Sequence, residues 1–234
     1  SDKKPHKRTV NGEKIRLNKN RPIWHIFTQD YLTAGTDSIA VTVEWAMKEM
    51  LLKRETFGKL REEIRAEIGE KRLVNETDIP NLAYLQALIK ETFRLHPPIP
   101  VILRGSKEEC EVRGYTIEKE TLLIVNVWAI GRDERVWGNA TEFEPERFMR
   151  GETVDVKGQH YEMLVFGTGR RMCSGTALAV QLIPLALAAI VQCFDWREVE
   201  GGRIRDMREK AGITTPPAHD VLCYAHPLHA STFI

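Results

Sequence analysis

The sequence carries little net charge and few cysteines, and both shortages exclude classes of protein. Its 34 Lys/Arg and 33 Asp/Glu residues leave a net charge of +1, whereas a nucleic-acid-binding protein normally has a marked basic excess. The four cysteines, at positions 110, 173, 193 and 223, include no Cys-x-x-Cys pair. This scatter suits a reducing compartment and offers no zinc site. We therefore expect no nucleic-acid partner and no bound zinc.

Long uninterrupted apolar runs are also scarce. The longest, residues 176–194, approaches the length of a membrane span, but Gln181, Pro184 and Gln192 interrupt it, and we interpret it as a buried helix. The first 21 residues hold eight Lys/Arg and two Asp/Glu, with no signal peptide or apolar anchor among them. We expect residues 1–21 to be a flexible basic lead-in and residues 22–234 to belong to a single domain.

One cysteine, Cys173, stands in a distinctive motif. Residues 166–175 read Phe-x-x-Gly-x-Arg-x-Cys-x-Gly, with Gly169 and Gly175 at the two glycine positions. The glycines let the backbone bend so that amide groups can turn toward the sulfur. The helix expected after Gly175 places its positive end near Cys173, where it favours a negatively charged sulfur. Arg171 offers a guanidinium suited to a haem propionate, so the motif fits a thiolate ligand of haem iron. The alternative is a structural cysteine in a glycine-rich loop.

Two further motifs precede this loop. Residues 91–94 form a Glu-x-x-Arg on an expected helix, followed by His-Pro-Pro, and residues 143–148 read Phe-Glu-Pro-Glu-Arg-Phe. Taken alone, the first is an ordinary surface ion pair. In this order before a cysteine loop, however, the chain resembles the cytochrome P450 superfamily, with Phe166 beginning the loop. The resemblance implies a buried ion network of Glu91, Arg94 and Arg147 behind the haem, in which the loss of one partner costs several kcal/mol.

A fourth similar element lies on the first expected helix, residues 22–52, for which Asn20 is a plausible cap. In the family, the small pair matched by Ala34 and Gly35 lets this helix pass close to the haem and bulge open for dioxygen. Asp37 and Ser38 match the family's acid–alcohol pair, which relays protons; the family more often has Thr where Ser38 stands. Read without the family, the two residues resemble a cap-like Asp-Ser pair in a kinked helix.

The remaining pattern predicts helices over 55–68 and 80–95, a strand over 101–103, and a meander over 109–127. Its second turn, residues 118–120, lacks the Pro and Gly usual in the family. The resemblance implies a mainly α-helical fold with a small mixed β-sheet, and haem between two long helices. It also assigns Arg104 to a propionate, and it places five residues at the substrate: Val101, Ile102, Leu103, Ile213 and Thr214.

Residues 155–160, 190–196 and 210–214 are most similar to the plant flavonoid-oxidising group, which contains flavone synthase II, 2-hydroxyisoflavanone synthase and pterocarpan hydroxylases. The group usually has Pro where Ser174 stands, and Ser would leave the cysteine loop less rigid. The resemblance covers about residues 22–225, the C-terminal half of a typical member. The anchor, the early helices and the roof of the substrate pocket are therefore expected to be missing.

What the resemblance implies is a haem-thiolate monooxygenase with haem b, which uses O2 and NADPH-derived electrons to oxidise a flavonoid such as a flavanone. NADPH-cytochrome P450 reductase would dock on the face that carries Cys173, where Arg170 is a candidate contact. The implied location is the cytosolic face of the endoplasmic reticulum membrane, reached through an N-terminal anchor. Two alternatives stay open: oxidation of another plant small molecule, such as a terpenoid, and a truncated haem-binding remnant without catalysis.

Overall fold

The computed structural model describes residues 9–10, 13–14, 23–150 and 154–228. The chain divides into two units, residues 1–35 and 36–234. The first contains a short antiparallel ladder of β1 (Thr9–Val10) and β2 (Glu13–Lys14), together with the beginning of α1 (Ile23–Leu52). Most of the predicted lead-in lies outside the described residues, as do Asn20 and Pro22.

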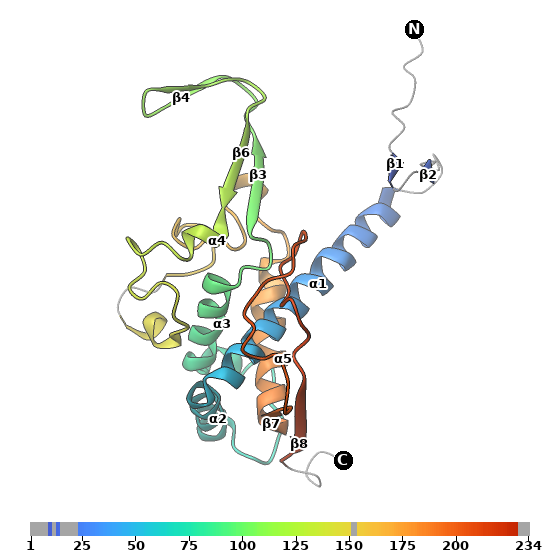
Figure 1. Cartoon of the computed structure of the whole chain (residues 1–234), viewed down its shortest axis with the longest axis vertical. Helices are drawn as coiled ribbons and strands as arrows, with labels where there is room; N and C mark the ends of the chain where they lie inside the picture. Colours follow the sequence, from blue (N-terminus) through green and yellow to red (C-terminus); the bar gives the residue numbers. More distant parts are fainter. Residues whose placement is uncertain (1–8, 11–12, 15–22, 151–153, 229–234) are drawn as a thin grey trace. The chain divides into compact units, whose positions relative to one another are not determined.

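In the second unit, three helices lie side by side around the apolar core: α2 (Arg54–Ile68), α3 (Ala83–Leu95) and α5 (Thr176–Cys193) (Figure 1). α2 shows why these segments form helices that pack together. Its charged residues alternate with Phe57, Leu60 and Ile64, which recur at helical spacing and are all buried. The predicted helices are therefore confirmed, within a residue or two for α1, α2 and α5. The shorter helical segments are η1 (Ile79–Asn81), α4 (Val127–Ile130), η2 (Pro145–Met149) and η3 (Gly169–Arg171).

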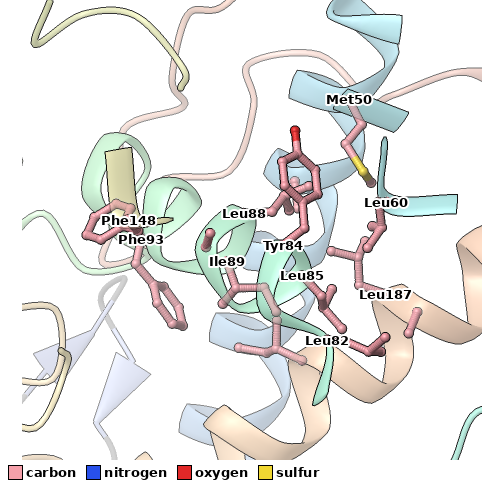
Figure 2. Packing of buried hydrophobic residues seen from close by; sticks show 14 of the residues in the cluster. Met50, Leu60, Leu82, Tyr84, Leu85, Leu88, Ile89, Phe93, Phe148 and Leu187 are labelled. Carbon is pink, nitrogen blue, oxygen red and sulfur yellow. The ribbon is translucent and has the colours of Figure 1, made fainter. Parts of the chain in front are cut away.

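The core gathers side chains from segments far apart in the sequence (Figure 2). α3 and the residue before it supply the central stripe, with Leu82, Leu85 and Leu88 fully buried. Leu60 of α2 and Leu187 of α5 pack against the same cluster. Burying a leucine side chain contributes roughly 1.5–3 kcal/mol, so this cluster is the main source of cohesion in the unit.

The N-terminus of α3 differs from its sequence prediction. Pro80 and Asn81 do not open this helix; they belong to η1, and α3 begins at Ala83 without a side-chain cap from its own flank. Instead, the carboxylate of Glu63 on α2 accepts the backbone N–H groups of Tyr84 and Leu85, at 2.6 and 3.0 Å. A carboxylate at this end satisfies amides that would otherwise lack partners and complements the helix dipole.

The strands form two-stranded antiparallel ladders. β3 (Val101–Gly105) pairs with β6 (Leu122–Asn126), and the β4–β5 hairpin (Cys110–Val112 and Tyr115–Ile117) extends beyond that ladder (Figure 1). β7 (Phe194–Glu198) pairs with β8 (Cys223–Pro227). The expectation of small sheet structure is confirmed, but among the described residues the pairings are antiparallel rather than mixed. A short turn can join antiparallel strands, as it does β4 and β5, whereas a parallel pair needs a long crossover.

The turn without Pro or Gly keeps a conformation that glycine would favour. Glu120 adopts a φ of 68°, and its backbone N–H donates to the Ser106 carbonyl at 3.0 Å. The Ser106 hydroxyl in turn donates to the Glu118 carbonyl at 2.6 Å. These hydrogen bonds impose a left-handed backbone on a residue with a Cβ, at a cost of about 1–2 kcal/mol.

In the part of the chain that the structure describes, α5 is the helix long and apolar enough to cross a membrane by length and composition. From Ile183 onward it contributes Ile183, Leu187 and Val191 to the core, as predicted for a buried helix. Its first half is different, because Leu178 and Leu182 are 58% and 41% exposed. The exposed half directly follows the cysteine loop.

Candidate functional site

The loop that carries Cys173 is a tight, hydrogen-bonded turn before α5. Its backbone takes left-handed conformations at Gly167 and Gly169, with φ of 73° and 69°. The Cys173 N–H donates to the Phe166 carbonyl at 2.9 Å, which closes the loop on itself. The Thr168 hydroxyl donates to the Gly158 carbonyl at 2.7 Å and ties the loop to the preceding segment. The turn presents the Cys173 thiol at the surface.

The cysteine also lies beside the start of α5, as the sequence predicts. Gly175 is the N-cap residue, and the Thr176 hydroxyl donates back to the Cys173 carbonyl at 2.9 Å. A Cβ at Gly175 would lie 3.7 Å from the Cys173 sulfur, so glycine leaves the space next to the thiol clear. Ser174 lies in the turn before the N-cap, not within the first helical turn. A Pro at this position would therefore make the segment leading into the helix more rigid, rather than the helix itself.

Two arginines from different segments meet beside this loop. Arg104 at the end of β3 donates to the Arg171 backbone carbonyl at 3.1 Å. Among the described residues, neither guanidinium forms an ion pair, so no acidic side chain offsets either positive charge and each can attract an anion. An accessible thiol, two cationic groups without acidic partners and the exposed apolar start of α5 together fit a haem, which has an iron, two carboxylates and an apolar ring. These residues could therefore hold that cofactor.

Phe166 connects the loop to the helix behind it. Its ring packs edge-on against Phe93 of α3, with 5.3 Å between centroids and 77° between planes. Such aromatic pairs contribute about 0.5–1.5 kcal/mol beyond the area that they bury. α3 also carries Glu91 and Arg94, so the cysteine loop rests on the element that bears the Glu-x-x-Arg motif.

Glu91, Arg94 and Arg147 form one buried ion network. The Arg94 guanidinium makes two parallel 2.7 Å bonds to the two oxygens of Glu91, and both side chains have zero exposed area. Arg147 of η2 reaches the same carboxylate at 3.1 Å, and the backbone N–H of Glu144 donates to it at 2.7 Å. Every oxygen of the buried carboxylate is thus satisfied, which burial of a charge requires.

The remaining guanidinium donors reach backbone carbonyls. Arg94 donates to Gly131 and Ala140, both at 2.6 Å, and to Glu142 at 2.9 Å. Gly131 is packed so tightly that a Cβ would overlap the Arg94 carbonyl oxygen. The network therefore ties the loop between α4 and η2 to α3 through one charged side chain.

The expected relay residues lie on α1. Asp37 is exposed and Ser38 half-buried, and the Ser38 carbonyl accepts the Thr42 hydroxyl at 2.8 Å. Ala34 and Gly35 belong to the other unit, residues 1–35. The expected bulge at that pair is not present, since α1 is α-helical from Ile23 to Leu52. A continuous helix satisfies backbone groups that a bulge would leave unpaired.

The five expected substrate-facing residues divide by exposure. Val101, Leu103 and Ile213 are exposed, Ile213 to 86%. Ile102 and Thr214 are half-buried. The Ile102 side chain approaches the cysteine loop, because a Cβ built on Gly167 would lie 3.6 Å from it.

A second polar cluster links α1, α3 and the segment after β7, and no role was expected for it. His96 stacks on Trp45 with centroids 3.9 Å apart and planes at 3°, and its Nε2 lies 2.8 Å from Glu49. Its Nδ1 lies 3.8 Å from Glu209. One signal in the sequence could have indicated this face of α1. Lys48 and Glu49 follow Trp45 at a spacing of three and four residues, which places the three side chains on one side of a helix.

Glu209 is the charged centre of this cluster. Burial alone would raise its pKa, but the nearby His96 ring, the hydrogen bond from Trp128 and the positive charge of Arg132 hold the pKa below its usual range. Burial lowers the pKa of Arg132 to about 10. The Trp128 indole donates to Glu209 at 3.0 Å, and the Arg132 guanidinium lies 4.0 Å from the Trp128 ring centre.

Comparison with known proteins gives a consistent result. The family model for cytochrome P450 matches residues 25–224. The chain is 49% identical over 203 residues to 3,9-dihydroxypterocarpan 6A-monooxygenase of Glycine max, covering 86% of this chain and 40% of that protein. It is 45% identical over 207 residues to 2-hydroxyisoflavanone synthase of Glycyrrhiza echinata, covering 83% and 40%.

Solved structures show the same fold. A zebrafish cytochrome P450 structure with abiraterone superposes with a TM-score of 0.78 at 24% identity, over 86% of this chain and 46% of that one. A structure of a zebrafish cytochrome P450 with progesterone gives a TM-score of 0.77. The chain spans about 40% of the length of the curated relatives described above.

Proposed function

Because this chain belongs to the cytochrome P450 family, we propose that it acts as a haem-thiolate monooxygenase on a plant flavonoid such as a flavanone. The observation that carries the proposal is the cysteine loop, where an exposed thiol lies beside two arginines without acidic partners. The similar proteins named for pterocarpan and isoflavanone chemistry support the substrate class.

Cys173, on the loop between Phe166 and Gly175, would supply the thiolate that holds haem b. A thiolate-ligated haem activates dioxygen and favours cleavage of the O–O bond over reversible binding. Arg104 and Arg171 would bind the two carboxylates of the cofactor through charge-assisted hydrogen bonds. Gly169 and Gly175 would allow the tight turn and keep the space beside the sulfur clear.

The other groups would position reactants and move protons. Asp37 and Ser38 would carry protons from solvent to the oxygen site, because a carboxylate and a hydroxyl can both accept and pass on a proton. For Ala34 and Gly35, which belong to residues 1–35, the role that the resemblance implies stays a prediction. Glu91, Arg94 and Arg147 would hold α3 and the loop after α4 in place behind the cysteine loop.

The substrate and partner assignments follow the same reasoning. Ile102, Leu103 and Ile213 present apolar side chains suited to a flat, hydrophobic phenolic molecule. Electrons would come from NADPH through a cytochrome P450 reductase, which would dock on the face of Cys173 and contact Arg170. The protein would work at the cytosolic face of the endoplasmic reticulum membrane.

A carbon monoxide difference spectrum of the reduced, haem-supplied protein tests the proposal. We expect a strongly red-shifted Soret band, lost in Cys173→Ala and retained in the control Cys110→Ala, which removes another exposed cysteine. A band that persists in Cys173→Ala, or that is missing from the unmodified protein, contradicts the proposal. Incubation with flavanones and, in parallel, terpenoids then tests the substrate class by product analysis.

A further inference from the structure

A hydrogen bond joins two segments that lie 177 positions apart in the sequence. The Thr214 hydroxyl donates to Oδ2 of Asp37 at 2.5 Å. Asp37 is on α1, whereas Thr214 belongs to the loop before β8, the loop that the family resemblance places at the substrate. A hydrogen bond to a charged group is shorter and stronger than one between neutral groups.

The loop that carries Thr214 is anchored by its next residue. The buried Thr215 donates its hydroxyl to the Pro97 carbonyl at 3.0 Å and its N–H to the Pro98 carbonyl at 3.1 Å. Its own carbonyl accepts the Trp45 indole N–H at 2.8 Å. The backbone that follows Thr214 is therefore held by hydrogen bonds of Thr215, which limit how far the Thr214 hydroxyl can move away.

The helix that carries Asp37 is tied to the same segment. Trp45 lies two turns after Asp37 on α1, is fully buried and stacks on His96. Lys48, one turn further, donates to the Asp206 carbonyl at 2.6 Å. The bond between Thr214 and Asp37 thus forms between two segments already fixed by buried contacts, so little conformational entropy is lost in making it.

We propose that Thr214 is a positioning residue for proton delivery: it holds the Asp37 carboxylate through Oδ2 and leaves Oδ1 to take a proton from water and pass it on. This inference rests on the proposed monooxygenase function. It adds a role for Thr214 that differs from a contact with substrate. Without the hydroxyl, the Asp37 side chain is free to rotate, and its proton is delivered in the correct direction less often.

The test compares Thr214→Val, which keeps the shape and removes the hydroxyl, with Thr214→Ser, which keeps the hydroxyl. Thr116→Val, at an exposed threonine of β5, controls for the chemical change. All are haem-loaded and first checked for the red-shifted carbon monoxide band, whose absence from the unmodified protein would defeat the proposed function itself. The ratio of oxidised product to NADPH consumed and the hydrogen peroxide released are then measured.

We expect Thr214→Val to lose roughly tenfold in product per NADPH, a fraction of the 10²–10⁴-fold that a positioned acid or base contributes. Thr214→Ser should stay within about twofold, and the dissociation constant for substrate, from spectral titration, should not change in either variant. Equal coupling in Thr214→Val and the unmodified protein overturns the inference. So does a weaker substrate affinity with unchanged coupling, which would make Thr214 a substrate contact.

A readout independent of turnover is a double-mutant cycle on urea unfolding. Thr214→Val should lower the unfolding midpoint, and the same substitution should have little further effect in an Asp37→Ala background. Additive shifts would show that the hydrogen bond does not join the two residues in solution, and would overturn the inference.

Discussion

The Glu91 network and the Cys173 loop lie on either side of the Phe93–Phe166 contact and treat charge in opposite ways. In the network, the buried Arg94, the half-buried Arg147 and one buried carboxylate satisfy each other and nearby carbonyls. At the loop, Arg104 and Arg171 meet without an acidic partner among the described residues, beside an exposed thiol. Charged side chains that have partners of opposite sign within the protein stabilise the fold, whereas charged side chains without such partners are suited to binding a charged ligand.

Removing the charge of Glu91 should have the largest effect on stability. Glu91→Gln leaves two arginines facing a neutral amide in a buried site, and we expect a loss of about 3–5 kcal/mol in the free energy of unfolding. Urea denaturation followed by circular dichroism measures this loss. Glu62→Gln, on the exposed face of α2, is the control and should change stability by less than about 0.5 kcal/mol. If Glu91→Gln lost no more stability than Glu62→Gln, the two arginines would not depend on the charge of Glu91.

A methyl group at Gly131 should damage the same network through its backbone. Gly131→Ala forces a Cβ against the Arg94 carbonyl, and overpacking of this kind costs about 1–3 kcal/mol. Gly138→Ala is the matched control, since a Cβ there meets nothing within 4 Å. Unfolding of both variants under identical conditions gives the comparison, and a neutral Gly131→Ala would mean that this loop can move away.

The Glu209 cluster offers a pH test of intermediate size. Because the folded-state pKa of Glu209 lies below its ordinary value, its contribution is fully present above the unfolded carboxyl pKa of about 4.3 and is lost as pH falls through the folded value. Glu209→Gln should therefore lose less stability than the unmodified chain between about pH 5 and pH 3. Glu76→Gln, at an exposed position, should keep the original pH slope; identical slopes in all three proteins would contradict the prediction.

Replacing Glu120 by glycine should be stabilising. Glycine adopts the left-handed conformation of this turn without a Cβ penalty, and after its greater unfolded-state entropy is counted we expect a gain of about 0.5–1 kcal/mol. Thermal unfolding measures the gain. Glu118→Gly, in the same turn but at negative φ, should instead destabilise, and a loss in Glu120→Gly would show that the left-handed backbone is not strained.

The smallest change in stability should come from the loop itself. Arg171→Met removes a cation that no described acidic side chain offsets, so the free energy of unfolding should change by less than about 0.5 kcal/mol. Haem affinity, measured by titration of the haem-free protein, should nevertheless fall, because a charge-assisted hydrogen bond to a carboxylate is lost. If Arg171→Met lowered the stability but left the haem affinity unchanged, Arg171 would stabilise the fold, as the Glu91 network does, instead of binding a ligand.

Much of the fold follows from local patterns. α2 and α5 begin and end within a residue of their predicted limits, because apolar spacing and the glycine before Thr176 are local signals. The β3 strand after the proline run was equally readable. The mixed sheet was wrong, since pairing depends on which strands meet in space. The bulge predicted in α1 at Ala34 and Gly35 was also wrong. It was inferred from the family resemblance, but the helix is continuous at these residues.

The sequence by itself determined the family, through the spacing of residue types around Cys173 and the order of the Glu-x-x-Arg and Pro-Glu-Arg-Phe motifs. Each of these motifs spans only a few consecutive residues, so it can be recognised without knowing how the chain folds. Tertiary structure alone decided that Glu63 caps α3, that His96 lies between Trp45 and Glu49, and that Thr214 reaches Asp37. Each of these contacts joins distant segments, and their geometry is set by how the buried helices and the loop before β8 pack together.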